Sequence, residues 1–560
     1  MTFERNKVDM ESGAPQQQQQ QQQQHSSAGT LLHPSPIQSR DSKKAAKEAA
    51  GAGDDDVFNE EGPVIRRGEQ CDDPAEIIVN SDGHVGEPDD REPSALMQVL
   101  LCCVSALEGA DTTLLAAVMM ALQDDIGVKI TDLGYLTVSQ AVATNLAGPF
   151  WGIMADRGVL QRRVILLLGA MGQGIVTMLL SFVTGVGTMV ILRILNGILL
   201  ASLRPICNGI IADVTSEKHR GKIFGRVQSA LLFGMFITSL TAVQISRKVI
   251  VGFQGWRVAF LLVGSISIVV SALVFFLMVE PPREQLRRPG EGGCKALLTE
   301  MKQLLKFFTM PTFCVMIVQG IFGTIPWSVM GYTTLFFQLC GIDDGQVALL
   351  TGTGPITAAI GNMIGGLISD ALSQRLGLHG RPLSAQLSVA MGVPLIYLVV
   401  QGVPPGSGSF GIYFLLNVAF GLLGSWAQSG TNFPILSHIV PASARSSVMA
   451  WECAFENSIA NGIGPTVAAQ LAMAFGYSFG QHKGTTKDLK SANALGQALA
   501  ATICLPWLVC FVAYTALHIT YPWDIKRLER QVIKDQAINH NSEDERSQTV
   551  REVDGVAVSV

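Results

Sequence analysis

The sequence is poor in charge for its length. Lys, Arg, Asp and Glu make up 15% of its 560 residues, whereas a soluble protein carries about 25%. The charges crowd into the two ends of the chain, so the middle is poorer still. The hydrophobic share is 48% and the mean hydropathy is +0.33. We therefore expect an integral membrane protein.

Several chemistries lack their sequence signals. The 10 cysteines show no paired metal-ligand spacing, and most lie in apolar segments, where Cys packs as a small hydrophobe. No phosphate-cradling Gly-x-x-x-x-Gly-Lys-Ser/Thr loop and no Ser/His/Asp set occurs, so neither a primary pump nor an enzyme is expected. No basic stripe with interleaved aromatics suggests a nucleic-acid partner. We expect no cofactor and no metal.

The N-terminal residues 1–94 are polar and contain an unbroken run from Gln16 to Gln24. Such a segment buries too little apolar surface to fold, so we expect a disordered cytosolic tail. It is either a sorting or regulatory tail or a replaceable extension. No secretory signal opens the chain, and the first apolar span is expected to act as an internal insertion signal.

Apolar segments long enough to cross a hydrocarbon core of about 30 Å fill the middle of the chain. They predict an all-α membrane protein with twelve transmembrane helices in two six-helix bundles. The bundles are expected at 95–279 and 310–520, joined by a charged cytosolic linker at 280–309 and followed by a cytosolic tail at 521–560. Lys and Arg gather in the loops after even-numbered spans, which predicts that both termini face the cytosol. The predicted spans are 95–122, 132–154, 163–185, 188–213, 220–245, 256–279, 310–337, 345–370, 382–403, 409–437, 446–475 and 493–520.

A short loop between the second and third spans organises this pattern. It combines a small residue, a carboxylate at a helix end and several guanidinium groups, and a shorter version recurs in the second bundle. A small residue lets another helix approach closely, and the charges can lock or release neighbouring helices. The recurrence indicates a transporter built from two related bundles. The predicted gating residues are Gly152, Asp156, Arg157, Arg162, Arg163, Gly366 and Asp370.

These features resemble the major facilitator superfamily over about residues 95–525. Further matches are Arg193-x-x-x-Gly197, Asp213 to Arg220-Gly221, and Gly255-Trp256-Arg257-x-Ala-Phe260. One departure is that Gly158 follows Arg157 directly, with Arg162–Arg163 coming later.

Within the superfamily the chain resembles a plant and protist group related to the Spinster-like transporters. The matching residues are Glu108-x-Ala-Asp111, Pro311-Thr-Phe, Pro326-Trp-Ser, Thr431-Asn432-x-Pro434, Ile439-Val-Pro441 and Phe455-Glu456. This resemblance implies proton-linked export of lysophospholipids or sphingolipids.

Ionisable residues are costly inside a bilayer and usually serve function. Glu108 and Asp111 share a helix face at i, i+3, and two adjacent carboxylates do not both ionise cheaply. Asp111 is the predicted proton carrier because it aligns with the Spinster-like helix-one Asp, and Glu108 is its coupled partner. Arg204 of the fourth span is the predicted counter-ion of Glu108, because both lie deep in their spans and the resemblance implies that the first and fourth spans line one cavity. Arg193, near the opposite end of the fourth span, is expected to bond loop carbonyls or to touch substrate.

A static ion pair that only fixes helix packing is the alternative in the first bundle. In the second bundle, Glu452 and Glu456 share a face at i, i+4 and form a second candidate proton or cation site. A hydrogen-bonded network between helices fits them equally well.

Amide and aromatic residues of the seventh and tenth spans suit an amphipathic ligand, because rings hold its apolar part and amides orient its polar head. Each of them, taken alone, also fits plain helix packing. The predicted substrate-binding residues are Gln319, Trp327, Asn417, Trp426, Gln428 and Asn432.

The sequence thus predicts a monomeric secondary active transporter that moves a small organic or amphipathic solute by alternating access, coupled to protons. Its expected partners are a small-molecule or lipid substrate, protons and the lipid bilayer. A receptor or scaffold that binds ligand without flux is one alternative, and a transporter of a water-soluble organic anion or sugar is another. Plasma-membrane and endolysosomal locations are not distinguished by the tails.

Overall fold

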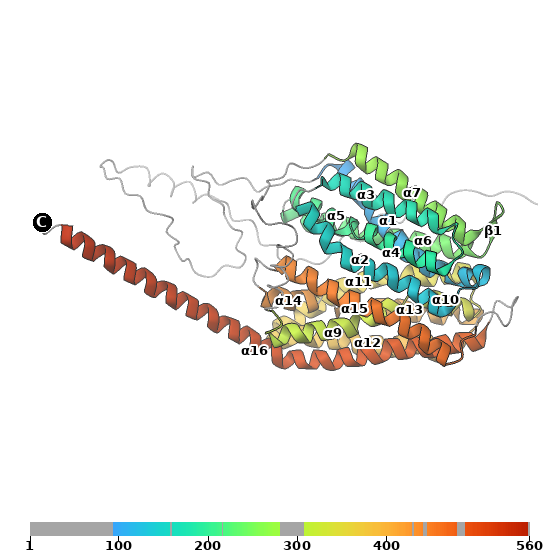
Figure 1. Ribbon diagram of the computed structural model, residues 1–560. Helices are drawn as coiled ribbons and strands as arrows, with labels where there is room; N and C mark the ends of the chain where they lie inside the picture. Colours follow the sequence, from blue (N-terminus) through green and yellow to red (C-terminus); the bar gives the residue numbers. More distant parts are fainter. Residues whose placement is uncertain are drawn as a thin grey trace, which may run out of the picture. The chain divides into compact units, whose positions relative to one another are not determined.

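The structure is a computed structural model that describes residues 93–156, 160–215, 217–279, 307–427, 431–440, 445–478 and 488–557. The expected N-terminal tail lies outside these ranges except for its last two residues. The expected linker also lies almost wholly outside them. The described residues are overwhelmingly helical (Figure 1).

The first half of the described chain, called the N-half here, contains seven α-helices and one short hairpin among its described residues. Residues Val251 and Gly252 at the hairpin turn both have positive φ, 50° and 81°, as a tight two-residue turn requires. The elements are α1 (Ala95–Ile126), α2 (Ile130–Asp156), α3 (Arg162–Leu180), α4 (Val186–Leu200), α5 (Leu203–Val214), α6 (Glu217–Ser246), β1 (Val249–Ile250), β2 (Phe253–Gln254) and α7 (Gly255–Leu277).

The second half, called the C-half here, ends in a helix that continues well beyond the predicted last span, to Ala557. A π-helical turn, Leu398–Gly402, extends α12, and short 3-10 turns occupy Gly377–His379 and Ser407–Ser409. The helices are α9 (Pro311–Val329), α10 (Tyr332–Leu339), α11 (Asp344–Leu376), α12 (Gly380–Tyr397), α13 (Phe410–Leu423), α14 (Phe433–Ile439), α15 (Arg445–Ala474) and α16 (Leu489–Ala557).

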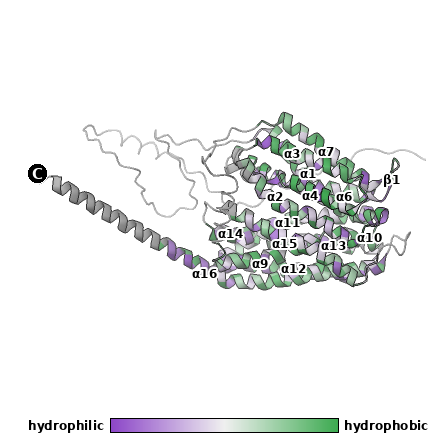
Figure 2. Cartoon of the chain, in the orientation of Figure 1, coloured by the Kyte–Doolittle hydropathy of each residue, from purple (hydrophilic) through white to green (hydrophobic). Residues whose placement is uncertain are grey.

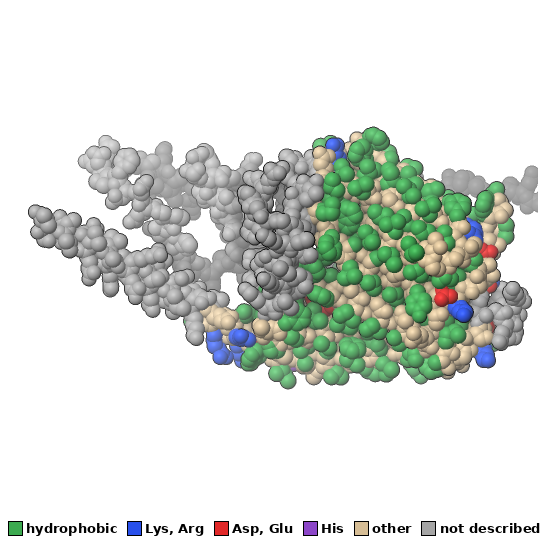
Figure 3. Space-filling model, viewed as in Figure 1, with side chains coloured by type: hydrophobic (Ala, Val, Ile, Leu, Met, Phe, Trp, Pro, Cys, Tyr) green, Lys and Arg blue, Asp and Glu red, His purple; other side chains and the backbone are tan. Residues whose placement is uncertain are grey.

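The all-helical membrane architecture is confirmed. Within the described ranges, eight helical segments are long and apolar enough to cross a membrane, and apolar residues dominate their surfaces (Figure 2). Large side chains such as Phe276 and Ile191 are 79% and 66% exposed, as lipid-facing residues are. In the space-filling view, apolar side chains cover the flank while Lys, Arg, Asp and Glu gather near the helix ends (Figure 3).

Three of the predicted continuous spans are broken. Span 188–213 is divided at Ala201–Ser202, span 310–337 at Met330–Gly331, and span 409–437 between α13 and α14. Pro205 and Pro434 follow two of these breaks. Proline has no backbone N–H and cannot continue the i→i−4 hydrogen-bond ladder of a helix. The apolar character of the sequence continues across these breaks, so hydropathy alone does not reveal them.

Glycines set the closest helix crossings. A Cβ added to Gly109 of α1 would overlap the carbonyl of Leu231 in α6, and one added to Gly234 of α6 would overlap the carbonyl of Ala106. Such small residues let backbones approach without steric conflict. Between the halves, α2 packs on α15 and α6 packs on α11, so polar groups facing this interface can respond to both halves.

Candidate transport site

The predicted gating loop is only partly described. Arg157 and the side chain of Asp156, the last residue of α2, lie outside the described part. Arg162 begins α3 and is 5% exposed. Its Nη2 lies 3.3 Å from where a Cβ of Gly209 would be. Arg163 donates from Nε to Gln161 at 2.8 Å and lies over the Phe275 ring at 5.8 Å.

The second copy of this loop forms an ion pair. Asp370, near the end of α11, lies 2.9 Å from Arg381 at the start of α12. A Cβ at Gly366 or at Gly152 would meet no described atom within 4 Å. Neither glycine is therefore a point of close helix approach among the described residues in this conformation.

Asp111 of α1 is fully buried and satisfied by donors from three other helices. Its carboxylate accepts from Gln140 of α2 at 2.7 Å, from Thr177 of α3 at 2.8 Å and from Asn196 of α4 at 3.3 Å. Gln140 also donates to Asn196 at 2.6 Å. Through this network the Asp111 carboxylate connects its own helix, α1, to α2, α3 and α4.

Arg193 lies beside that network rather than at a loop. It is in the middle of α4 and only 2% exposed, and Asp111 acts on it electrostatically. Its Nε and Nη1 have no hydrogen-bond partner among the described residues. Neither atom makes the predicted contact with a loop carbonyl among the described residues, and the contact with substrate stays a prediction.

Glu108 forms the predicted contact with Arg204. Arg204 Nη2 and Nε lie 2.7 Å and 2.8 Å from Glu108 Oε1. The Glu108 side chain is 12% exposed, whereas that of Arg204 is 61% exposed. The two α1 carboxylates therefore bind different partners, Asp111 on one side and Glu108 on the other.

In the C-half, Glu452 and Glu456 of α15 are 2% and 3% exposed and lie one helical turn apart on the same face. Cys453 donates from Sγ to Glu452 Oε2 at 3.5 Å. Glu456 Oε1 has no hydrogen-bond partner in the described part of the chain. Two buried carboxyl groups this close together do not both ionise cheaply.

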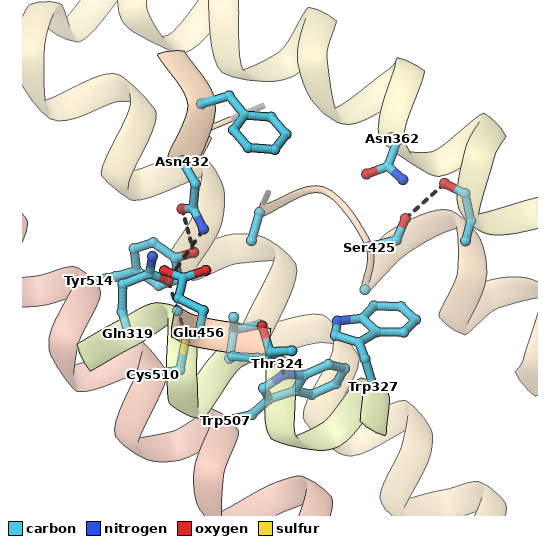
Figure 4. Close-up of a pocket in the computed structure, with 17 residues that line it drawn as sticks. Gln319, Thr324, Trp327, Asn362, Ser425, Asn432, Glu456, Trp507, Cys510 and Tyr514 are labelled. Carbon is cyan, nitrogen blue, oxygen red and sulfur yellow. Dashed lines mark hydrogen bonds between the residues drawn. The ribbon is translucent and has the colours of Figure 1, made fainter. Parts of the chain in front are cut away.

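Glu456 borders a cavity of ≈ 300 Å3. Figure 4 shows it beside Gln319 of α9 and Tyr514 and Cys510 of α16. Trp327 of α9 and Trp507 of α16 line the other side. This volume is at the lower end of the range for small-molecule sites. The lining mixes aromatic rings with amide, hydroxyl and carboxyl groups.

Three of the six predicted substrate residues line this cavity: Gln319, Trp327 and Asn432. The other positions that the structure describes do not. Asn417 donates to the Leu350 carbonyl at 2.6 Å, and Trp426 donates to the Leu422 carbonyl at 2.5 Å, so both join helices or turns. Gln428 lies outside the described residues.

The sequence reasoning missed the contribution of the last helix. Trp507, Cys510 and Tyr514 line the cavity, spaced by three and four residues along α16. That spacing puts them on one helix face and could have identified them in an otherwise apolar span.

Away from the Gly152 loop, polar contacts join the two halves at the other end of α1. Arg247, just beyond α6, lies 3.5 Å from Asp124 of α1 and 3.7 Å from Asp344 of α11. Tyr477, after α15, donates to Gln123 of α1 at 2.9 Å. We call these five residues the Arg247 cluster. It holds the halves together at this end.

Comparison with known proteins assigns the family. The sequence profile of the Major Facilitator Superfamily matches residues 101–465. The chain belongs to this superfamily. It is therefore a membrane transporter, a class that binds small-molecule substrates within the bilayer. The prediction of a two-bundle transporter fold rests on this match and on the solved structures below.

Relatives and structures within this superfamily are diverse. The multi-drug resistance efflux pump PmrA of Streptococcus pneumoniae is 25% identical over 381 residues, covering 66% of this chain and 88% of the pump. Protein spinster homolog 1 of Xenopus tropicalis is 22% identical over 322 residues, covering 54% and 60%.

Solved structures share the fold. A bacterial homologue of the human lysosomal transporter Spinster, inward-facing and unoccupied, has a TM-score of 0.63 at 18% identity, covering 77% of this chain and 99% of that one. A D-xylose-proton symporter has a TM-score of 0.55 at 17% identity, covering 74% and 96%. The Spinster-like resemblance is thus supported in both sequence and fold.

Proposed function

We propose that this superfamily member carries an amphipathic organic solute in exchange for, or together with, protons. Two bundles, 95–279 and 310–520, would rock around a central site, with both termini in the cytosol. The observation that carries the proposal is the C-half cavity, which combines an aromatic wall with buried carboxyl groups.

The cavity lining matches an amphipathic solute. Two lining residues, Trp327 and Trp507, form a ring cluster with Phe420, which is not itself part of the lining. The centroids are 5.9 Å apart for Trp327–Phe420, 6.1 Å for Trp327–Trp507 and 5.7 Å for Phe420–Trp507. Trp327 remains 41% exposed and Phe433, another lining residue, 39%. Such rings can hold an apolar body, while Gln319 and Asn432 offer amides that orient a polar head.

Proton coupling is supported by carboxyls that lack a fixed charge partner. A carboxyl held in a dry site is protonated unless a cation or several donors stabilise its charge. Glu452 and Glu456 have chiefly each other, so proton uptake and release at this pair is the simplest way to vary its charge. In the N-half, Glu108 is a candidate because its partner Arg204 is exposed enough to leave it. Asp111 stays the predicted proton carrier of that half, and releasing or taking up a proton there would require its three hydrogen bonds to rearrange.

Alternating access is supported by the unequal ends of the interface. The Arg247 cluster joins the halves at one end, whereas Gly152 and Gly366, towards the other end, meet no described atom within 4 Å of an added Cβ. Opening the closed end requires the Arg247 contacts to part, and closing the open end would bring the two glycine-bearing helices against neighbours.

For cargo we propose a lysophospholipid-like or sphingolipid-like amphiphile, with a water-soluble organic anion or sugar as the second candidate. The lipid-like choice follows from the half-exposed Trp327 and Phe433, which give an apolar tail a route out of a small cavity. An anion is favoured only by Arg204, whose exposed guanidinium could leave Glu108 for a ligand.

Thermal stability of the purified protein against a ligand panel tests this proposal, at about pH 5.5 and about pH 7.5. The panel sets lysophospholipids and sphingoid bases beside sugars, amino acids and organic anions. A ligand of the folded state raises stability by RT ln(1 + [L]/Kd). Hits are then tested for flux in proteoliposomes with an imposed pH gradient. Stabilisation by sugars alone would contradict the amphiphile proposal, and binding without flux would contradict transport of that ligand.

A further inference from the structure

The buried carboxyl of Glu456 is the least satisfied acidic group that the described residues contain around the cavity. The side chain is 3% exposed, and Oε1 has no hydrogen-bond partner there. Burying a carboxyl oxygen without a donor or a counter-charge is costly, so the position calls for an occupant that supplies a donor or a positive charge.

The space around this carboxyl is built into the fold. A Cβ added to Gly320 of α9 would overlap the Glu456 carboxyl group, so only glycine leaves it in place. The nearby donors are already used: Tyr514 donates to Asn432 Oδ1 at 2.9 Å, and Asn432 Nδ2 lies 3.5 Å from Gln319 Oε1. These amide and phenol groups bind each other, and none of them supplies a hydrogen bond to Glu456 Oε1, which packs against Gly320.

The aromatic side chains that line the cavity suit a ligand with a positive charge as well as a hydrophobic body. The faces of Trp327 and Trp507 carry negative electrostatic potential, and cations bind over such faces. An anion would meet both the ring faces and the glutamates unfavourably. The lining therefore selects by sign of charge, not only by shape.

We propose that this cavity takes an ammonium group carried on a small apolar body, and that the entering cation replaces a proton held by Glu452 and Glu456. This inference rests on the proposed function, since it names the substrate class of the same cavity. One proton leaves to solvent for each cation that enters, so the net charge of the buried site stays constant and no new uncompensated charge is created.

The other titratable groups facing Glu456 do not disturb this exchange. They are Cys453 of α15 and Cys510 and Tyr514 of α16, and all three are ordinarily neutral at physiological pH. Gln319 and Asn432, from α9 and the turn before α14, carry no charge. The carboxyl pair is thus the acid that responds.

The decisive probes are 3-hydroxyphenyltrimethylammonium and 3-tert-butylphenol. They have the same shape and differ only in the central atom of the trimethyl group, a positively charged nitrogen in the first and a neutral carbon in the second. Binding of each to the purified full chain is measured by calorimetry, and proton release is followed with a pH dye in weak buffer. We expect Glu456→Gln to weaken ammonium binding at least about tenfold. It should change binding of the phenol less than about twofold, and the release of about one proton per ammonium should disappear.

Two further variants sharpen the result. Glu529→Gln, an exposed glutamate on the extension of α16, should leave both affinities and proton release unchanged. Gly320→Ala, which must displace the Glu456 carboxyl, should weaken ammonium binding more than phenol binding. A sphingoid base that binds far more tightly than the short ammonium would identify a lipid as the natural source, and equal binding would identify a free amine.

Wild-type protein that binds the phenol as tightly as the ammonium, or binds the ammonium without releasing a proton, would overturn the inference. Neither result would affect the proposed function, which depends on flux of some solute through the membrane. Absence of proton-driven flux for the whole ligand panel, with ammonium binding intact, would instead contradict transport and leave the ammonium site standing.

Discussion

Each half of the molecule buries two carboxyl groups one helical turn apart, yet their surroundings are opposite. In the N-half, Asp111 accepts from three donors and lies near Arg193, and Glu108 is paired with Arg204. In the C-half, Glu452 and Glu456 lie one turn apart on α15, and Glu456 Oε1 has no hydrogen-bond partner among the described residues. Similar spacings in the sequence, three residues in one half and four in the other, are therefore surrounded by bound donors in the N-half and leave an unsatisfied acceptor in the C-half.

The difference lies in what neighbouring helices supply. In the N-half, α2, α3 and α4 present amide and hydroxyl donors to Asp111, and two arginines balance the charges. In the C-half, α9 presents a glycine and α16 an aromatic face. Satisfied buried networks stabilise a fold, whereas an unsatisfied carboxyl beside a cavity is available for protons and ligands. The predictions below test that division, from the largest effect to the smallest.

Asp111→Ala should be the most destabilising of these changes. It leaves Arg193 as a buried charge without its counter-charge and removes three hydrogen bonds, so we expect a loss of about 3 kcal/mol or more. Thermal or denaturant unfolding in detergent measures it. Asp111→Asn, which keeps an acceptor, is the matched control and should lose less. A loss no larger for Asp111→Ala than for Glu456→Ala would contradict the contrast between the halves.

Glu456→Gln should do the reverse, affecting transport far more than stability. The amide keeps the size of the side chain and removes a poorly satisfied acid, so stability should stay within about 1 kcal/mol of the wild type. Proton-driven flux in proteoliposomes should fall at least about tenfold, because the group that exchanges the proton is gone. Glu529→Gln serves as control. Flux that keeps its full pH dependence would remove Glu456 from the coupling mechanism.

The sequence alone predicted the helical membrane fold, because apolar runs, loop charges and superfamily motifs are local signals. It also predicted the Glu108–Arg204 contact from the depth of each residue in its span. It did not show that Asp111 and Glu108 have different partners. A spacing of three residues puts both on one helix face, but it does not say in which direction each side chain extends from that face. The role of Asn417 in helix packing and of Trp507 in the cavity depends on how helices cross, which hydropathy does not encode.

Arg204→Gln should have an intermediate effect confined to function. Its side chain is 61% exposed, and exposed ion pairs contribute only about 0–1 kcal/mol, so unfolding should change little. The rate and pH dependence of flux should both change, since Glu108 loses its ion-pair partner. Arg204→Lys, which keeps the charge, is the control. Unchanged rate and pH dependence in Arg204→Gln would show that this pair is a static packing contact.

Arg247→Ala should have the smallest effect on stability, and it should favour the conformation in which the two halves are separated at the Arg247 end. The contacts of Arg247 at 3.5 Å and 3.7 Å join Asp124 of one half to Asp344 of the other, and such partly exposed pairs contribute under about 1 kcal/mol each. That is enough to change the populations of two states severalfold when they differ little in free energy. Spin labels at exposed positions of the two halves should report a larger separated fraction at this end. The same variant in an Asp344→Ala background should add little, because the contact between halves is already lost, and fully additive effects would show that Arg247 acts elsewhere.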